Sequence, residues 1–144
     1  MIRHAGLIAQ RVAGRWLGVL VEGPSGAGKS DLALRALGQG FRLVADDRVV
    51  LWASGERLFG RAPETLQGLL EVRGLDVIRV QALPVCEVGL VVRLGPAERI
   101  PDPAYEDILG VQLPALATPA FEESAPAKLS RALSSFDAAH KRRI

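Results

Sequence analysis

The first half of the chain alternates short apolar runs with segments rich in glycine or in helix-forming residues. Leu7 to Val12 is typical of a short strand, and Leu17 to Val21 is a continuous non-polar run that predicts a buried strand. Asp31 to Leu37 is rich in leucine and alanine, both strong helix formers, and Gly38 follows it as glycine follows many helices. Phe41 to Ala45 predicts the next strand. This order indicates an α/β domain with buried strands.

Further strands are predicted in the middle of the chain. Val49 to Trp52 and Arg57 to Phe59 are predicted to pair as a hairpin with Ser54-Gly55 in its turn. Asp76 to Val80 and Val85 to Leu94 each have the apolar pattern of a strand. These segments extend the expected sheet.

Two other segments are predicted to be helical. Thr65 to Leu70, after Pro63, is predicted to form one or two helical turns. Beyond Gly95 the strand pattern weakens, because prolines interrupt it repeatedly. A last helix is predicted within Lys128 to Ala139, since four apolar residues there would share one face: Leu129, Ala132, Leu133 and Phe136.

Composition limits the architecture to one domain. The chain has 144 residues, with no repeat and no long polar linker, so a single domain over residues 1–144 is expected. Hydrophobic residues make up 49% and aromatic residues 5%, so the core must be aliphatic. The single cysteine, Cys86, lies in an apolar run and is predicted to be a small buried hydrophobe. Neither a signal peptide nor a membrane span is visible, so a cytoplasmic protein is expected.

The charge pattern disfavours a nucleic-acid-binding protein. The formal net charge is +2, of which Lys141, Arg142 and Arg143 supply +3, so the rest of the chain carries +2 − 3 = −1. A balanced body with a basic tail is a weak footprint for DNA or RNA. The tail is interpreted as a solvated end.

The strongest motif is a phosphate-binding loop. GPSGAGKS matches GxxxxGK[ST] at every fixed position, with an apolar strand before it and a helix-forming run after it. Glycines let the backbone curl with its amides inward, where they and the helix N-terminus hold phosphate oxygens. The lysine would reach the β and γ phosphates of ATP, and the serine hydroxyl would serve Mg²⁺. The residues predicted to bind the nucleotide are Gly23, Pro24, Ser25, Gly26, Ala27, Gly28, Lys29 and Ser30.

An acidic pair is expected beside this loop. The helix runs ~14 Å away from the phosphates, and the strand Phe41 to Ala45 returns ~17 Å toward them. A right-handed βαβ unit then brings Asp46 and Asp47 to the loop, at the edge where α/β sheets bind ligands. Because neighbouring strand residues point to opposite faces, only one of the pair should face the phosphates unless the strand bends. That acid could bind Mg²⁺ or accept a proton from an attacking hydroxyl; the alternative is a solvated turn.

Three segments together resemble a known family. Gly23–Ser30, Leu43–Val49 (LVADDRV) and Leu70–Leu75 (LEVRGL) are similar to the catalytic domain of HPr kinase/phosphorylase, over about residues 2 to 95. The resemblance is to short members that lack a separate N-terminal domain. It implies a P-loop-like fold related to phosphoenolpyruvate carboxykinase. It also implies an ATP-dependent kinase acting on a seryl hydroxyl of HPr, the phosphocarrier of the bacterial phosphotransferase system, in an enzyme that is often a hexamer.

The resemblance also implies residue roles. Asp47 would take the serine proton, Lys29 would contact phosphate, His4 matches a histidine upstream of the phosphate loop, and Arg73 lies in a segment used in catalysis. The implied catalytic residues are therefore His4, Lys29, Asp47 and Arg73, and the implied Mg²⁺ ligands are Ser30 and Glu71. An ordinary exposed salt bridge between Glu71 and Arg73 is the alternative interpretation of that segment.

The last third departs from the family pattern. Tyr105 to Gly110 lacks the arginine that longer members carry in the comparable stretch. Ala125 to Leu129 replaces a Gly-Arg-Asn-Leu-Ala segment that the family uses for dephosphorylation. These departures argue against the phosphorylase reaction and against the hexamer. They affect the expectation of a kinase reaction less.

Two other functions stay open at this point. A small-molecule kinase or ATPase can also combine a phosphate loop with one acid. A nucleotide-sensing regulatory module could keep the loop without turnover, although such a module needs neither Asp47 nor Glu71.

Overall fold

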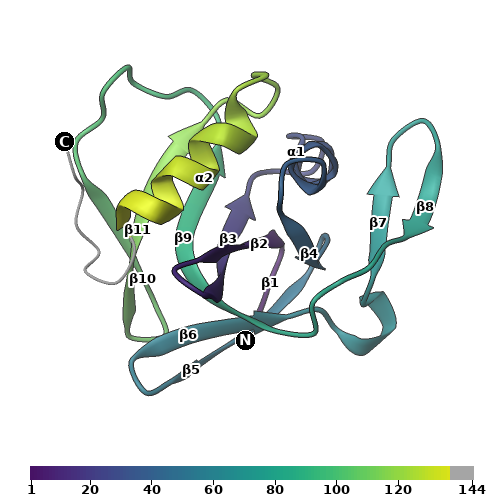
Figure 1. Cartoon of the computed structure of the whole chain (residues 1–144), viewed down its shortest axis with the longest axis horizontal. Helices are drawn as coiled ribbons and strands as arrows, with labels where there is room; N and C mark the ends of the chain where they lie inside the picture. The colour runs from purple at the N-terminus through teal and green to yellow at the C-terminus, as the bar shows by residue number, and fades with distance from the viewer. Residues whose placement is uncertain (137–144) are drawn as a thin grey trace.

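The computed structural model describes residues 1–136 and has two helices packed on a large mixed sheet (Figure 1). Among these residues, no helix is long and apolar enough to cross a membrane. The elements are β1 (Ile2–Arg3), β2 (Gly6–Val12), β3 (Arg15–Glu22), α1 (Lys29–Leu37), β4 (Arg42–Ala45), β5 (Val49–Ser54), β6 (Arg57–Arg61), the 3-10 helix η1 (Glu64–Leu66), β7 (Leu69–Val72), β8 (Asp76–Arg79), β9 (Cys86–Leu94), β10 (Ala104–Ile108), β11 (Val111–Thr118) and α2 (Ala125–Phe136). The α/β fold class is therefore confirmed.

The strand order brings four strand ends to one edge of the sheet. The hydrogen-bonded order is β1-β5-β6-β9-β3-β2-β4, and β11 pairs with β9 and β10. Strands β3, β9 and β11 are mutually parallel, and β4 runs with them because both β3 and β4 are antiparallel to β2. The sequence predicts that β3 and β4 end at the same edge, and they do, but β2 lies between them. Ligands of α/β sheets bind at such an edge.

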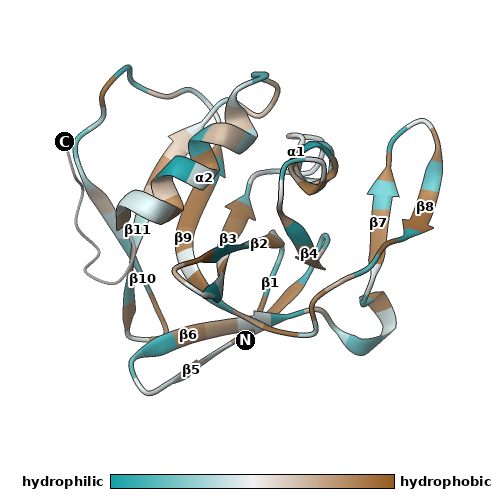
Figure 2. Cartoon of the chain, viewed as in Figure 1, coloured by the Kyte–Doolittle hydropathy of each residue, from teal (hydrophilic) through white to brown (hydrophobic). Residues whose placement is uncertain are grey.

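Two aliphatic layers enclose the central strands. Val19 and Val21 of β3 belong to the core cluster that includes α1 and α2, whereas Leu20 belongs to the cluster that includes β5, β6, β10 and β11. Successive residues of one strand thus serve opposite faces, as the pleat requires. The unbroken apolar run at 17–21 follows from this burial on both sides, and Figure 2 shows the same hydrophobic colouring along β3 and β9.

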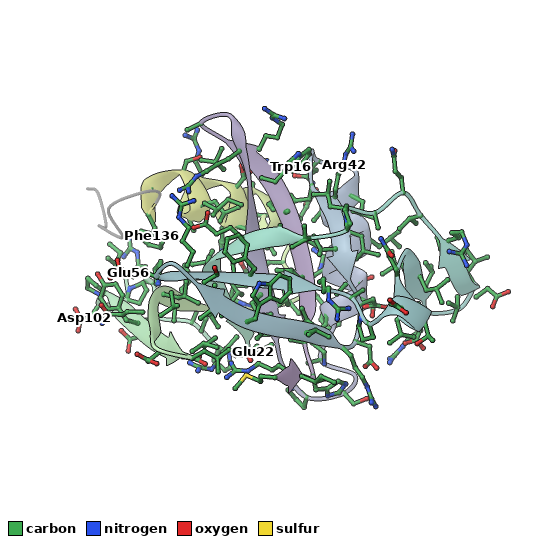
Figure 3. The ribbon with its side chains drawn as sticks, turned by 90° about the horizontal axis from the view of Figure 1, so that it is seen from below. Trp16, Glu22, Arg42, Glu56, Asp102 and Phe136 are labelled. Carbon is green, nitrogen blue, oxygen red and sulfur yellow. The ribbon has the colours of Figure 1, made fainter. Side chains whose placement is uncertain are left out.

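The Trp16 ring contacts two arginine side chains. The guanidinium carbons of Arg11 and Arg42 lie 5.7 Å and 5.2 Å from the centre of the Trp16 ring. Figure 3 shows Trp16 and Arg42 side by side on neighbouring parts of the sheet. Such cation–π contacts shield a ring that the sheet leaves half-buried.

The predicted elements of the first half are confirmed, with one shift in the hairpin. The turn between β5 and β6 consists of Gly55 and Glu56, not Ser54-Gly55, because Ser54 pairs with Arg57. Gly55 and Glu56 have φ values of 56° and 66°. Two consecutive left-handed residues are what a two-residue hairpin turn needs to match the twist of its strands.

The segment Thr65 to Leu70 is helical only at its start. The 3-10 turn η1 ends at Leu66, and Leu69 already begins β7, so the predicted single turn is confirmed at the start of the segment and the alternative of two turns is wrong. Gly68, with φ 78°, redirects the chain between them. The β7–β8 hairpin that follows stands apart from the large sheet (Figure 1).

The last third contains two strands that the sequence does not predict. Pro114 lies inside β11, opposite Tyr105 of β10, but β11 pairs with β9 only from Ala115 onward. The proline therefore removes no hydrogen bond from the β9 ladder, which is why this strand tolerates it. The predicted last helix is confirmed as α2 up to Phe136, and its four apolar residues are buried. Ala139 and the basic tail lie outside the described residues.

Cys86 is buried as the sequence predicts. Its side chain is enclosed at the start of β9, and burial raises the pKa of the thiol to about 12. The thiolate needed for nucleophilic chemistry is therefore disfavoured in the folded protein.

Gly18→Ala should destabilise the fold. A Cβ at this position of β3 would lie 2.7 Å from Cys86 Sγ, 2.9 Å from Leu7 Cδ1 and 3.1 Å from the Glu87 carbonyl oxygen. Overpacking of this kind lowers the free energy of unfolding by about 1–3 kcal/mol, which urea denaturation measures. Gly95→Ala is the matched control, since no atom lies within 4 Å of its Cβ. Equal stability of the two variants would contradict the tight packing of β3 on β9.

Candidate functional site

The phosphate loop joins β3 to α1 as its pattern predicts. Gly26 and Gly28 have φ values of 82° and 104°, which glycine adopts without steric cost. The Ala27 N–H donates to the Pro24 carbonyl oxygen at 3.0 Å and closes the curl. Helix α1 begins at Lys29, so its free N-terminal amides lie at the loop, where a phosphate would be held.

Lys29 is almost fully buried, yet its charge is not paired with a carboxylate. Its ammonium donates to the carbonyl oxygens of Gly23 at 2.6 Å and Pro24 at 3.1 Å. No acidic side chain among residues 1–136 forms an ion pair with it. A buried lysine with only backbone partners retains its attraction for an anion, which suits a phosphate-binding role.

Asp46 links three parts of the fold through its two carboxylate oxygens. The Ser30 hydroxyl donates to Oδ1 at 2.7 Å, and the backbone N–H of Glu71 donates to Oδ2 at 3.0 Å. The side chain is buried at the end of β4. From the sequence, one acid of the pair Asp46-Asp47 was expected to bind Mg²⁺ or to accept a proton, and the family resemblance gave a role to Asp47 alone. A carboxylate bonded to the loop serine is the arrangement that P-loop enzymes use around Mg²⁺.

Asp47 also reaches the site, because the chain bends sharply after β4. Its φ is 71°, in the left-handed region, so Asp46 and Asp47 are not held to opposite faces as in a continuing strand. His4 Nε2 lies 2.7 Å from Asp47 Oδ1, and the Ala5 N–H donates to the Asp47 carbonyl oxygen at 3.1 Å. The half-exposed carboxylate also lies 3.6 Å from Arg48 Nε. The structure therefore brings His4, which is distant in sequence, to the predicted base.

Glu71 and Arg73 lie at the end of β7 and line the same cavity. The cavity measures about 260 Å³, and the predicted catalytic and metal-binding residues line it, namely His4, Lys29, Ser30, Asp47, Glu71 and Arg73. Among the ion pairs of residues 1–136, none joins Glu71 to Arg73, so the structure gives no support to the alternative of a salt bridge.

Some of the eight loop residues line the cavity, and the others determine the shape of the loop. Ser25, Gly26 and Gly28 line it together with Lys29 and Ser30. The others shape the loop through the backbone contacts described above. The cavity wall also includes Phe121, which follows β11 and which no motif in the sequence indicates.

The site offers only a few oxygen ligands, which is enough for a Mg²⁺ ion that is also bound by phosphate oxygens. No group of three or more histidine, cysteine, aspartate or glutamate side chains within residues 1–136 could hold a metal ion by itself. Mg²⁺ is usually bound by one or two carboxylates together with phosphate oxygens and water. The hydroxyl of Ser30 and the carboxylates of Asp46 and Glu71 are of that kind.

These features define an α/β protein with a phosphate-binding loop at a helix N-terminus and acidic groups beside it. The family described as "HPr Serine kinase C-terminal domain" matches residues 4–88. This match spans more than half of the chain and includes the phosphate loop and both acidic segments. The chain belongs to that family.

Individual relatives agree with the assignment. HPr kinase/phosphorylase of Limosilactobacillus reuteri (strain DSM 20016) is 43% identical over 86 residues, which are 54% of this chain and 27% of the relative. The protein of the same name from Leptothrix cholodnii is 40% identical over 111 residues, 66% of this chain and 34% of that protein. The chain thus spans about a third or less of these curated relatives. A solved structure titled "Structure of the Hpr(Ser) kinase/phosphatase from Coxiella burnetii" superposes with a TM-score of 0.75 at 27% identity, covering 91% of this chain and 92% of that one.

Asp46→Ala should destabilise the protein through two unpaired groups. The substitution leaves the Ser30 hydroxyl and the Glu71 N–H without their acceptor, and orphaned polar groups of this kind cost about 1–3 kcal/mol each in unfolding free energy when buried. Urea denaturation measures the loss. Asp102→Ala, an exposed carboxylate outside the cavity, is the control and should change little. A loss no greater than in this control would contradict the linking role of Asp46.

Proposed function

We propose that the chain is an ATP- and Mg²⁺-dependent kinase that phosphorylates a serine of HPr, or of a paralogue, in a bacterial phosphotransferase system. One observation carries the proposal: Asp47, held by His4, faces the same cavity as Lys29 and Ser30 of the phosphate loop. A base and a phosphate-binding loop in one cavity are what transfer to a hydroxyl needs. The names of the relatives supply the acceptor.

In the proposed phosphoryl transfer, some residues neutralise phosphate charge and others accept the proton or orient the groups that react. Lys29, turning from the loop carbonyls, would neutralise charge on the β and γ phosphates, and Arg73 would add a second cation. The acceptor serine oxygen forms a bond to the γ phosphorus while the bond from that phosphorus to the β–γ bridging oxygen breaks. The serine proton goes to the Asp47 carboxylate. His4, within hydrogen-bond distance, orients that carboxylate.

The ion site is part of the same proposal. Ser30, Asp46 and Glu71 would hold Mg²⁺ with the nucleotide phosphates, and Mg²⁺ would supply charge neutralisation there. Asp46 is an addition to Ser30 and Glu71, the ligands that the family resemblance implies.

The biological setting also follows as a proposal. A cytoplasmic location fits a kinase that uses ATP. A homo-oligomer, and by family resemblance a hexamer, stays a prediction. The kinase reaction is proposed without the phosphorylase reaction, because Ala125 to Leu129, in place of the dephosphorylation segment, form the start of α2 and contribute no residue to the cavity wall.

A transfer assay tests the proposal directly. Purified protein is mixed with γ-labelled ATP, Mg²⁺ and an HPr-type phosphocarrier, and the phosphorylated residue is mapped by mass spectrometry. We expect phosphoserine on the carrier with the native protein and none with Lys29→Ala. ATP binding without label on the carrier would overturn the HPr kinase proposal and favour a small-molecule kinase or a nucleotide sensor.

Asp47→Asn should retain ATP binding and lose most of the transfer. The amide cannot accept the serine proton, and loss of a general base typically lowers the rate by ~10²–10⁴-fold. Binding is measured by titration calorimetry and transfer by the assay above. Asp102→Asn, the same change at an exposed carboxylate outside the cavity, is the control. A transfer rate that Asp47→Asn leaves unchanged would remove Asp47 from the mechanism.

Glu71→Gln should raise the Mg²⁺ concentration needed for half-maximal transfer. The amide keeps the shape of the side chain but removes a negative oxygen ligand, and its backbone N–H can still donate to Asp46. A Mg²⁺ titration at saturating ATP measures the shift. If the midpoint of the titration stays at the native value, Glu71 is not a metal ligand.

A further inference from the structure

Phe121 is an exposed aromatic side chain in the wall of the cavity that the phosphate loop lines. It lies between β11 and α2, is 69% exposed, and lines the same cavity as the phosphate loop. Exposed phenylalanine gains little from the fold itself, since most of its apolar surface stays in water. A planar apolar face beside a phosphate site points to a ligand that carries both a phosphate chain and a flat ring.

The backbone on both sides of Phe121 is clamped to α1. The Arg35 guanidinium donates to the carbonyl oxygen of Ala120 and, at 3.0 Å, to that of Glu122. Arg35 is itself oriented by Asp31, whose carboxylate accepts from Nε at 2.9 Å. In Figure 1 the segment before α2 accordingly lies beside α1. The position of Phe121 is thus fixed by the pair of side chains Asp31 and Arg35 on α1.

The ring rests against the phosphate loop. A Cβ added to Gly28 would lie 2.8 Å from Phe121 Cζ and 3.0 Å from Ala120 Cβ. The glycine at this position therefore gives the backbone its left-handed turn and also leaves room for the aromatic ring. Loop and ring form one continuous surface.

Strand order places Phe121 opposite the catalytic acids. β9 and β11 lie on one side of β3, and β2 and β4 lie on the other. Asp47 follows β4, whereas Phe121 follows β11, so they approach the loop from its two sides. A nucleoside triphosphate bound along the loop would have its γ phosphate at the end near Asp47 and its base at the end near Phe121.

We propose that Phe121 is the stacking platform for the nucleotide base, with Arg35 as its positioning residue. The inference rests on the proposed function, since it assumes that the loop binds a nucleoside triphosphate. The face of Phe121 contacts the base, while Lys29 and Ser30 hold the phosphates. Phe121 then determines affinity for the nucleoside part of the ligand and leaves the triphosphate part unaffected.

Calorimetric titration of the full chain with MgATP and with magnesium tripolyphosphate tests the proposal, because tripolyphosphate lacks the base. Phe121→Ala should weaken MgATP binding by about 5- to 100-fold, the range that loss of one base–aromatic stack causes. Tripolyphosphate binding should stay within about twofold, since the phosphate contacts are untouched. Phe121→Tyr should restore MgATP affinity. Ile100→Ala, an exposed apolar residue outside the cavity, is the matched control.

Arg35→Ala provides a second test, because it retains the Phe121 side chain but removes the hydrogen bonds that position its segment. Freeing the segment should weaken MgATP binding without weakening tripolyphosphate binding, and a general loss of stability would not produce that difference. Equal losses for both ligands, or no loss of MgATP affinity in Phe121→Ala, would overturn the base platform and leave the kinase proposal standing. If the native protein binds neither ligand, the proposed function fails together with the platform.

Discussion

The buried carboxylate of Asp46 is the constraint on which the site depends. A charged group at this depth must have its oxygens satisfied. Within residues 1–136, its side-chain oxygens accept hydrogen bonds from the Ser30 hydroxyl and the Glu71 backbone amide. Meeting this requirement joins the first turn of α1, the end of β4 and strand β7. The phosphate loop, the acidic turn and the outlying hairpin are thereby held in one arrangement, which the aliphatic core alone would not specify.

Sheet topology supplies the rest of the convergence. Four strands end at one edge, and the segments that follow three of them carry the phosphate loop, the acidic pair and Phe121. β1 brings His4 to the same place by pairing with β5. The chemical groups thus come from residues far apart in the chain, while each is attached to a rigid element. Such attachment gives the precision that phosphoryl transfer demands.

Membership of the HPr serine kinase C-terminal domain family accounts for the first part of the chain more closely than for the last. The family match ends at residue 88, within β9. Beyond it, β10, β11 and α2 still complete both core layers, as the structural similarity over 91% of the chain reflects. The segment between β11 and α2, which carries Phe121, lies in the part of the chain beyond the family match.

The sequence by itself determined the phosphate loop, because the glycines, the lysine and the serine act through local backbone geometry and need only a strand before them and a helix after them. It also predicted the early strands, α1 and α2, whose apolar spacing reflects burial directly. It did not reveal β10 and β11, since a proline such as Pro114 normally interrupts a strand. The structure shows that β11 pairs with β9 only from Ala115, so the N–H that Pro114 lacks is not needed for that pairing. Only the tertiary structure decided that β2 separates β3 from β4, that Asp46 bonds Ser30 and that Phe121 covers Gly28. Each of these is a contact between distant segments, whose free energy depends on the packing of the whole chain and leaves no periodic signal along it.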